Sequence, residues 1–373
     1  MPVKGLTERL KDGENIIIAE GYMWEFERRG YLKSGGFVPE VVLENPEMVR
    51  SMHYEYVHAG SDVVEAFTYY GHREKLRSIG REDDLEKLNK NALRIAREVA
   101  DDTGTLMAGN INGTGVYSVE DKESHKYARD MFKEQVQWAI DGGCDFIIAE
   151  TFCYLGEALI ALDVIKDAGV PAVMTLTPYV PDITLDDIPF PKACRTLEEA
   201  GAAVVGLNCS RGPDTMLPLL RKIRKACKGP IAALPVPFRT SEKYPTFMSF
   251  RDPNTDRHLY PVDLTCCLCN RTDVKMFAEE AKDIGVQYIG LCCGNAANML
   301  REVAEVYGRK PPASEYSPDI SLNILIGETG EKINKEHSKV RKFSVGDFTL
   351  SELKQLNLQA HHETEEEHGD SEK

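Results

Sequence analysis

The sequence contains no apolar run that approaches the roughly 20 residues needed to cross a membrane, and its first residues lack the charged and then apolar layout of a secretory leader. It also lacks an excess of basic residues, because 45 Lys and Arg stand against 60 Asp and Glu and the formal net charge is −15. This balance argues against nucleic acids and membranes as partners and mildly favours a cationic ligand. We therefore expect a cytoplasmic protein, and nothing in the composition opposes a homo-oligomer.

The ten cysteines have no secretory leader ahead of them, so we expect reduced thiols or metal ligands rather than disulfides. Cys144, Cys194 and Cys227 each stand alone, and lone cysteines usually fill a core. Cys266 and Cys269 have the spacing of metal ligands, but no second pair accompanies them. We expect this pair either to have no role of its own in a long loop or to form part of a lid.

Short apolar segments alternate with helical patterns eight times along the chain. This alternation predicts an α/β fold of the (β/α)8 TIM barrel type, with a doubly wound sheet as the alternative. We assign the barrel to residues 1–310 and expect residues 311–373 to form a C-terminal extension with a partly disordered acidic tail. The apolar segments are 16–21, 62–68, 105–111, 145–151, 172–177, 204–209, 231–236 and 288–293.

Residues that can carry chemistry stand at the ends of these segments. Barrel enzymes hold their active sites at the C-terminal ends of the strands, so this placement favours the barrel over the doubly wound sheet. The residues are Glu20, Thr68, Asn110, Glu150, Thr177, Cys209, Cys292 and Cys293.

The most distinctive stretch is 288–294, an apolar run that ends in Cys292, Cys293 and a glycine. Adjacent cysteines cannot bridge each other without strain, so their thiolates are better suited to a soft metal ion. Cys209 ends another apolar segment in the same way. Three sulfurs thus meet at one end of the predicted barrel as a candidate Zn²⁺ site, which leaves one metal position open for a substrate thiol.

Two motifs around these cysteines resemble those of the zinc-dependent homocysteine S-methyltransferase family. Residues 205–209 read VGLNC and are similar to the GVNC motif, and residues 290–294 read GLCCG and are similar to the GGCCG motif. The resemblance covers about residues 15–310 and is nearest to the betaine–homocysteine methyltransferase branch. It also includes residues 29–31, 39–40, 59–61, 67–70 and 148–150. The resemblance implies an enzyme that methylates homocysteine to methionine, with the three cysteines as zinc ligands.

The substrate homocysteine would also present an ammonium group and a carboxylate, which need partners of opposite character. Glu20, which Gly21 follows, and Glu150 end two of the apolar segments and are the candidates for the ammonium group. Backbone amides, Thr68 or Asn110 are the candidates for the carboxylate. We also assign Glu150 to the catalytic group.

The methyl donor must carry an activated methyl group, as quaternary ammonium and sulfonium cations do. Aromatic faces attract such cations by about 0.5–2 kcal/mol each. The aromatic candidates are Trp24, Phe37, Tyr69 and Tyr70, and we assign Tyr70 to the catalytic group as well. The resemblance favours glycine betaine as the small cationic donor.

The chain departs from the betaine branch at three of these places. Glu20 stands where the family has aspartate, Thr151 stands where the branch has tyrosine, and Phe37 stands where the branch has tryptophan. Two aromatic positions of the donor cage are therefore altered. A sulfonium donor, S-methylmethionine or dimethylsulfoniopropionate, is the alternative, unless the loop around Phe238 and Tyr244 supplies the missing aromatic contacts.

A function without methyl transfer is a further alternative. In that case the barrel would hold a structural zinc, closed by a fourth protein ligand, and would bind thiols or methylated amines without turnover. A separate corrinoid protein as methyl donor is a third possibility. An open zinc position would separate the catalytic from the structural reading.

Overall fold

The computed structural model describes residues 4–323, and the chain divides into two compact units, Met1–Ser314 and Glu315–Lys373. The acidic tail expected near the end of the chain lies outside the described residues. The described part of the second unit includes a short 3-10 turn at Ile320–Leu322. The first unit contains the predicted strands.

Eight parallel strands form the centre of the first unit, in the order β1-β8-β7-β6-β5-β4-β3-β2. Asp62 joins the two ends of this order, because its backbone N donates to Ile17 O at 2.8 Å and its Oδ2 accepts from Ile17 N at 2.9 Å. The (β/α)8 TIM barrel is confirmed, since a doubly wound sheet would not place the strands in consecutive order. The strands are β1 (Ile16–Ala19), β2 (Val63–Glu65), β3 (Leu106–Asn112), β4 (Phe146–Phe152), β5 (Ala172–Leu176), β6 (Val204–Asn208), β7 (Ile231–Leu234) and β8 (Tyr288–Leu291).

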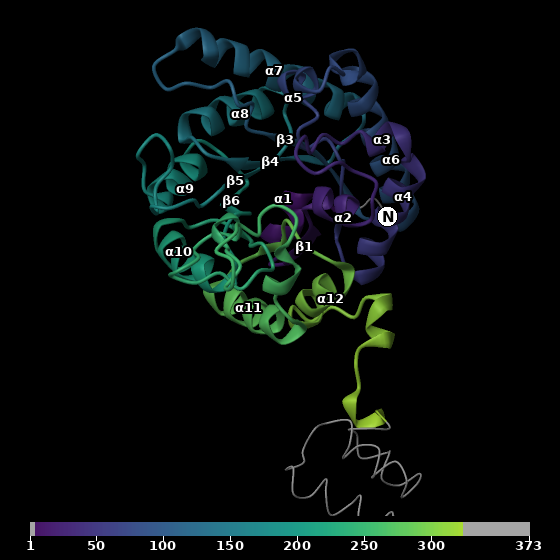
Figure 1. The fold of residues 1–373 in the computed structure, drawn as a ribbon. Coiled ribbons are helices and arrows are strands. Elements are labelled where there is room, and N and C mark those ends of the chain that lie inside the picture. Colours follow the sequence, from purple (N-terminus) through teal and green to yellow (C-terminus); the bar gives the residue numbers. More distant parts are fainter. Residues whose placement is uncertain (1–3, 324–373) are drawn as a thin grey trace, which may run out of the picture. The chain divides into compact units, whose positions relative to one another are not determined.

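Helices form a ring around the strands (Figure 1). Most present one apolar face to the barrel, as α6 does with Leu85, Leu88 and Ala92. The ring comprises α4 (Pro46–Ala59), α6 (Leu85–Thr103), α7 (Lys122–Asp141), α8 (Leu155–Asp167), α9 (Phe190–Glu199), α10 (Pro213–Ala226), α11 (Arg271–Ile284) and α12 (Ala297–Val306). Three short helices lie in the connections that follow β1 and β2, namely α2 (Tyr22–Arg28), α3 (Val41–Glu44) and α5 (Arg73–Ser78). The first helix, α1 (Leu6–Lys11), instead places Leu6 and Leu10 among the residues inside the barrel and so closes its N-terminal end.

Side chains alternate along each strand between the barrel interior and the layer beneath the helices. In β1, Ile16 and Ile18 belong to the interior cluster, whereas Ile17 and Ala19 belong to the cluster under the helices. The same alternation turns Glu20 inward, one residue past the strand. On the other strands it turns inward Glu65, Asn110, Glu150, Asn208 and Cys292. The interior therefore changes from apolar to polar at the C-terminal end of the barrel, where the sequence places the site.

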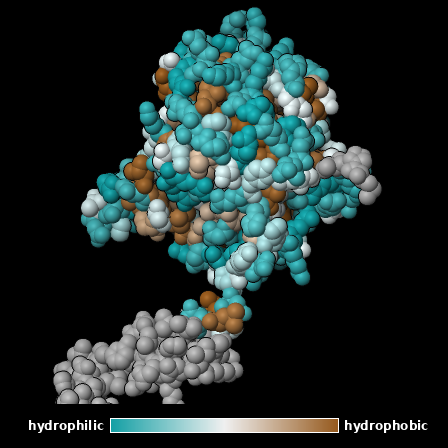
Figure 2. Space-filling view, turned by 90° about the vertical axis from the view of Figure 1, so that its right-hand side faces the viewer, coloured by the Kyte–Doolittle hydropathy of each residue, from teal (hydrophilic) through white to brown (hydrophobic). Residues whose placement is uncertain are grey.

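The surface of the molecule carries mostly hydrophilic side chains, with apolar ones scattered among them (Figure 2). Within residues 4–323, none of the helices combines the length and the apolar character that crossing a membrane requires. The helices are amphipathic instead, which is the pattern expected of a ring that covers a barrel on one side and meets water on the other.

Candidate active site

Three thiols meet at the C-terminal end of the barrel, because Cys209 directly follows β6 and Cys292 and Cys293 directly follow β8. The Sγ atoms of Cys209 and Cys293 lie 3.6 Å apart, those of Cys292 and Cys293 lie 3.9 Å apart, and all three lie within 4.8 Å of one another. Thiolates at about 2.3 Å from a tetrahedral zinc ion are about 3.8 Å from each other. The three cysteines therefore fit a zinc ion.

The backbone around the thiols is held in uncommon conformations. Cys209 has φ 61° and Ser210 has φ 58°, in the left-handed region that non-glycine residues rarely adopt. Gly21 has φ 79°, and a Cβ added there would lie 2.4 Å from the carbonyl carbon of Cys292. Glycine is thus required at residue 21 so that the chain after β1 can lie against the Cys292–Cys293 peptide.

Three carboxyl groups lie buried beside the thiols, with Glu20, Glu65 and Glu150 exposed by 0%, 3% and 4%. Asn110 Nδ2 donates to Glu65 and, at 2.6 Å, to Glu150 Oε1. Asn208 Nδ2 donates to Glu150 Oε2 at 2.6 Å and to Glu20 Oε2 at 3.3 Å. Two asparagines therefore hold the three carboxyl groups in one network.

Among the described residues, no cationic side chain pairs with the carboxyl network. Burial raises the pKa of all three groups, that of Glu150 to about 7, and the charge of Glu150 further raises the pKa of Glu20 and Glu65. Glu20 Oε1 has no hydrogen-bond partner among the described residues. Buried carboxylates are costly unless a cation compensates them, so a bound ammonium group would be stabilised here.

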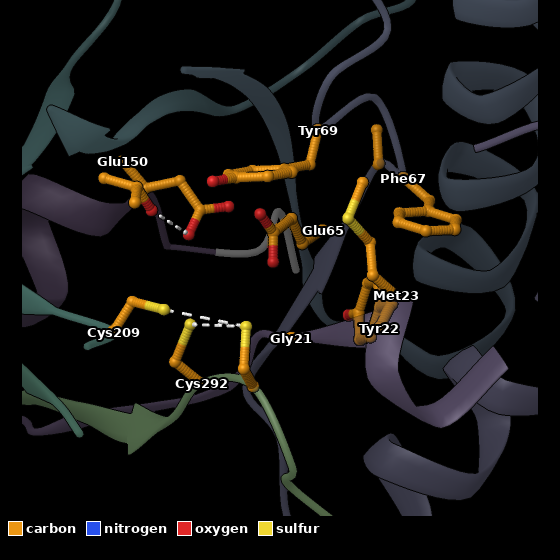
Figure 3. A pocket seen from close by; sticks show the side chains of 12 residues that line it. Gly21, Tyr22, Met23, Glu65, Phe67, Tyr69, Glu150, Cys209 and Cys292 are labelled. Atoms are coloured by element: carbon orange, nitrogen blue, oxygen red, sulfur yellow. Dashed lines mark hydrogen bonds between the residues drawn. The ribbon is translucent and has the colours of Figure 1, made fainter. Parts of the chain in front are cut away.

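An inner cavity connects the carboxyl groups with the thiols. Glu65 and Glu150 line it together with the three cysteines, and Met23 and Tyr69 complete its walls. In Figure 3 the carboxyl groups of Glu65 and Glu150 point toward the space between Tyr69 and the cysteines. A small molecule in this cavity would meet anionic groups at one side and sulfur at the other.

An outer cavity of about 300 Å³ adjoins the inner one, because Cys209, Cys293, Tyr69 and Thr151 line both. Four rings pack against one another in its wall: the Trp24 centroid lies 5.5 Å from that of Phe37, 5.6 Å from that of Phe247 and 5.8 Å from that of Tyr260. The aromatic residues that line this cavity are Trp24, Phe37, Tyr69, Tyr70, Tyr179, Phe247 and Tyr260. Such walls suit a methylated cation.

Most residues that the sequence singled out face these two cavities. Glu150 and Gly21 line the inner cavity, and Trp24, Phe37 and Tyr70 line the outer one. Tyr69 lines both, with its ring centroid 4.4 Å from that of Tyr70. These residues therefore lie where their predicted roles require them to lie.

Three of the predicted polar residues lie behind the cavity wall rather than in it. Glu20 was expected at the mouth but lies beneath the cavity, where Asn208 connects it to Glu150. The Thr68 hydroxyl donates to Asn110 O at 2.7 Å, and the Asn110 amide group is engaged by carboxyl groups. Of the predicted donors for the substrate carboxylate, backbone amides are therefore the ones left.

Two polar residues of the network, Glu65 and Asn208, were missed in the sequence. The sequence predicts one strand over 62–68 with its chemistry at Thr68, whereas β2 ends at Glu65. The alternation from Val63 makes Glu65 an inward residue, and it is the last one because β2 ends there. Asn208 stands next to Cys209 and also ends its strand, so the same rule would have found it.

The long loop 237–271 contributes aromatic residues to the outer cavity, but not those expected. Phe247 and Tyr260 line the cavity. Phe238 instead stacks on Phe247 at 5.8 Å, and Tyr244 packs on Phe250 at 5.8 Å. The loop therefore does supply extra aromatic contacts, with Phe238 as support rather than as a wall.

The cysteines of the same loop take no part in either cavity. Cys266 is exposed, with its Sγ 3.8 Å from that of Cys267. Cys269 is buried, and its backbone N donates to Pro237 O at 2.9 Å, next to the β-bridge between Phe238 and Leu268. Among the described residues, none of these loop cysteines belongs to the cluster formed by Cys209, Cys292 and Cys293.

A family model described as homocysteine S-methyltransferase matches residues 17–307. The chain belongs to the homocysteine S-methyltransferase family. Betaine–homocysteine S-methyltransferase 1 from Mus musculus is 32% identical over 84% of this chain and 78% of its own length. S-methylmethionine–homocysteine S-methyltransferase from Pongo abelii is 33% identical over 84% of this chain and 85% of its own length.

Among solved structures, the metallated form of the homocysteine methyltransferase MmuM from Escherichia coli is similar, with a TM-score of 0.63 at 18% identity over 79% of this chain and 98% of that one. This likeness shows the same fold. The predicted family is thus confirmed, and the two homocysteine S-methyltransferases compared above are named for different methyl donors.

Proposed function

We propose that this homocysteine S-methyltransferase transfers a methyl group from a small cationic donor, glycine betaine first, to the thiol of homocysteine, with zinc as cofactor and methionine as product. The observation that carries the proposal is the pair of contiguous cavities, in which three thiols lie between a carboxyl network and an aromatic chamber. Each part matches one portion of the two substrates.

Cys209, Cys292 and Cys293 would hold the zinc ion, since their sulfur separations match its tetrahedral geometry. When bound, zinc supplies an open ligand position at which a thiol loses its proton and becomes a nucleophile at neutral pH. The protein prepares this position by fixing the cysteines on two strand ends.

The carboxyl network would bind the ammonium group of homocysteine. Glu150 and Glu65 face the inner cavity, and Asn110 and Asn208 fix their orientation. Glu20 acts from behind through Asn208. The ammonium group supplies the cation that these buried carboxyl groups lack, so binding and charge compensation occur together.

The aromatic walls of the outer cavity would hold the donor so that one methyl group points toward the substrate sulfur. Sulfur then uses a lone pair to form the new S–C bond, while the C–N bond of betaine breaks and its electron pair returns to nitrogen. The leaving amine is neutral, so its attraction to the aromatic faces falls after transfer. Tyr70 would orient the cation rather than exchange a proton, because burial raises the pKa of its hydroxyl group.

A sulfonium donor is the second candidate, and Thr151 is the observation that favours it. Thr151 lies where the two cavities join and presents a small side chain where the betaine branch is expected to have an aromatic one. A relative named for S-methylmethionine is as similar to this chain as one named for betaine. A sulfonium has a smaller cationic head and a better leaving group, and so it needs fewer aromatic contacts in the outer cavity.

The test is zinc content followed by methionine formation from homocysteine with betaine, S-methylmethionine and dimethylsulfoniopropionate. We expect about one zinc per chain and activity with at least one of the three donors. A zinc-loaded protein that is inactive with all three would support the structural-zinc alternative. We place the reaction in the cytoplasm, which fits the free thiols of all ten cysteines.

A further inference from the structure

Among the described residues that line the outer cavity, Lys75 is the only one with a basic or acidic side chain. It lies at the start of α5, and its Nζ is 4.2 Å from the centroid of the Tyr70 ring. The rest of the lining is aromatic, apolar, hydroxyl or thiol. A cavity shaped for a cation thus contains one cation of its own, which would repel a donor that has only positive charge.

The Lys75 ammonium group has no acidic partner among the described residues. Burial alone lowers its pKa, with no carboxylate raising it. The carboxylates that line the adjoining groove are engaged elsewhere: Glu74 accepts from Arg77, and Glu157 accepts from Thr114 N at 2.8 Å. The protein thus supplies no anion to offset the partial desolvation of the Lys75 ammonium group, and a bound carboxylate would supply one.

We propose that Lys75 is a specificity-determining residue that binds the carboxylate of a zwitterionic methyl donor. The inference rests on the proposed function and assigns a residue to the carboxylate that glycine betaine, S-methylmethionine and dimethylsulfoniopropionate share. The onium group lies among the aromatic rings near Cys209 and Cys293, and the carboxylate lies at Lys75, beside Tyr70. Cations without a carboxylate, such as choline, are poor donors because their charge meets Lys75 uncompensated.

The test compares Lys75→Met, Lys75→Arg and the unchanged protein with matched donors. Glycine betaine is paired with choline, and dimethylsulfoniopropionate is paired with its methyl ester, so that each pair differs in the carboxylate alone. A charge-assisted hydrogen bond contributes about 1.5–3 kcal/mol, so KM for the zwitterionic donor should rise about 10-fold to 100-fold in Lys75→Met. KM for homocysteine and the zinc content should not change. Lys75→Arg keeps the positive charge and should therefore keep most of the donor affinity of the unchanged protein.

Lys87→Met is the matched control, since Lys87 is exposed on α6 and lines neither cavity. Donor binding can also be measured without turnover from the fluorescence of Trp24, in a Trp138→Phe background that removes the contribution of the other tryptophan. Betaine should bind Lys75→Met about 10-fold to 100-fold more weakly, while choline should bind it equally or more tightly. Equal betaine affinities in Lys75→Met and the unchanged protein would overturn the inference.

Failure of the inference and failure of the proposed function give different results. If the unchanged protein forms no methionine from any donor, methyl transfer fails as the function, and the fluorescence titration alone decides the role of Lys75. If it forms methionine and Lys75→Met keeps the same donor KM and the same preference within each pair, the function stands and the inference fails.

Discussion

At the scale of single residues, the proposed zinc site depends on three thiols that cannot replace one another. Two remaining thiolates offer too few ligands to retain zinc. We expect Cys209→Ala, Cys292→Ala and Cys293→Ala each to lose the metal, measured as zinc per chain after gel filtration.

Cys144→Ala is the control, because Cys144 precedes β4 and lies at the opposite end of the strand from the site. It should keep its zinc. Stoichiometric zinc in all three ligand variants would show that the metal lies elsewhere.

Glu150 offers a test of the carboxyl network. Glu150→Gln preserves the shape of the side chain and one acceptor for Asn110 or Asn208, so fold and zinc should survive. The charge opposite the substrate ammonium is lost, and kcat/KM for homocysteine should fall about 10-fold to 100-fold. Glu65→Gln should act in the same direction. If the kinetics of both variants were unchanged, the carboxyl network would have a structural role only.

His53 makes the fold sensitive to acid. Burial lowers its pKa to about 3, and neither ring nitrogen has a hydrogen-bond partner among the described residues. The unfolded chain takes up this proton near pH 6.5, so stability is full above that pH and decreases as the pH falls toward 3. In His53→Phe, the loss in unfolding free energy between pH 7.5 and pH 5 should be smaller by about 2 kcal/mol.

Denaturant titration at the two pH values measures this difference. His58→Gln serves as the control, because His58 is exposed on the same helix, α4. An equal loss in His53→Phe and the unchanged protein would mean that His53 is protonated in the folded state.

At the scale of elements, loop 237–271 decides how the donor is held. Tyr260 lines the outer cavity and contacts Trp24 and Phe247. Tyr260→Leu removes one aromatic face and about 0.5–2 kcal/mol of cation attraction, so donor KM should rise about 2-fold to 30-fold with homocysteine KM unchanged. Tyr54→Leu, a change on α4 outside both cavities, should leave both values as they were. A rise in homocysteine KM instead would place Tyr260 at the other substrate.

The elements also explain which parts of the site the sequence could predict. Period-two alternation makes Glu150 and Cys292 inward residues near strand ends, so both could be placed from sequence alone, whereas Cys209 follows the inward residue Asn208 and was found from the apolar run that it ends. Glu65 was missed because β2 is three residues long, and so short a strand leaves its end ambiguous. Phe247 and Tyr260 lie in an irregular loop without periodicity, where only tertiary contacts reveal which rings face the cavity.

At the scale of the whole molecule, the candidate site lies entirely in the unit Met1–Ser314. A chain that ends at Ser314 keeps all eight strands, the three thiols and both cavities. We expect it to bind zinc and to melt at the temperature of the full chain. Loss of zinc or of cooperative melting would show that residues 315–373 are part of the folding unit, and sedimentation of both chains would show whether these residues set the oligomeric state.

The contact between Gly21 and Cys292 joins the first strand of the barrel to the last. During synthesis, Glu20, Gly21 and the carboxyl network leave the ribosome long before Cys292 and Cys293 do. A growing chain therefore has only one of the three candidate zinc ligands, Cys209, until its last strand has emerged. The proposed zinc site is therefore complete only once almost the whole barrel has been synthesised, so zinc binding there would follow the folding of most strands rather than nucleate it.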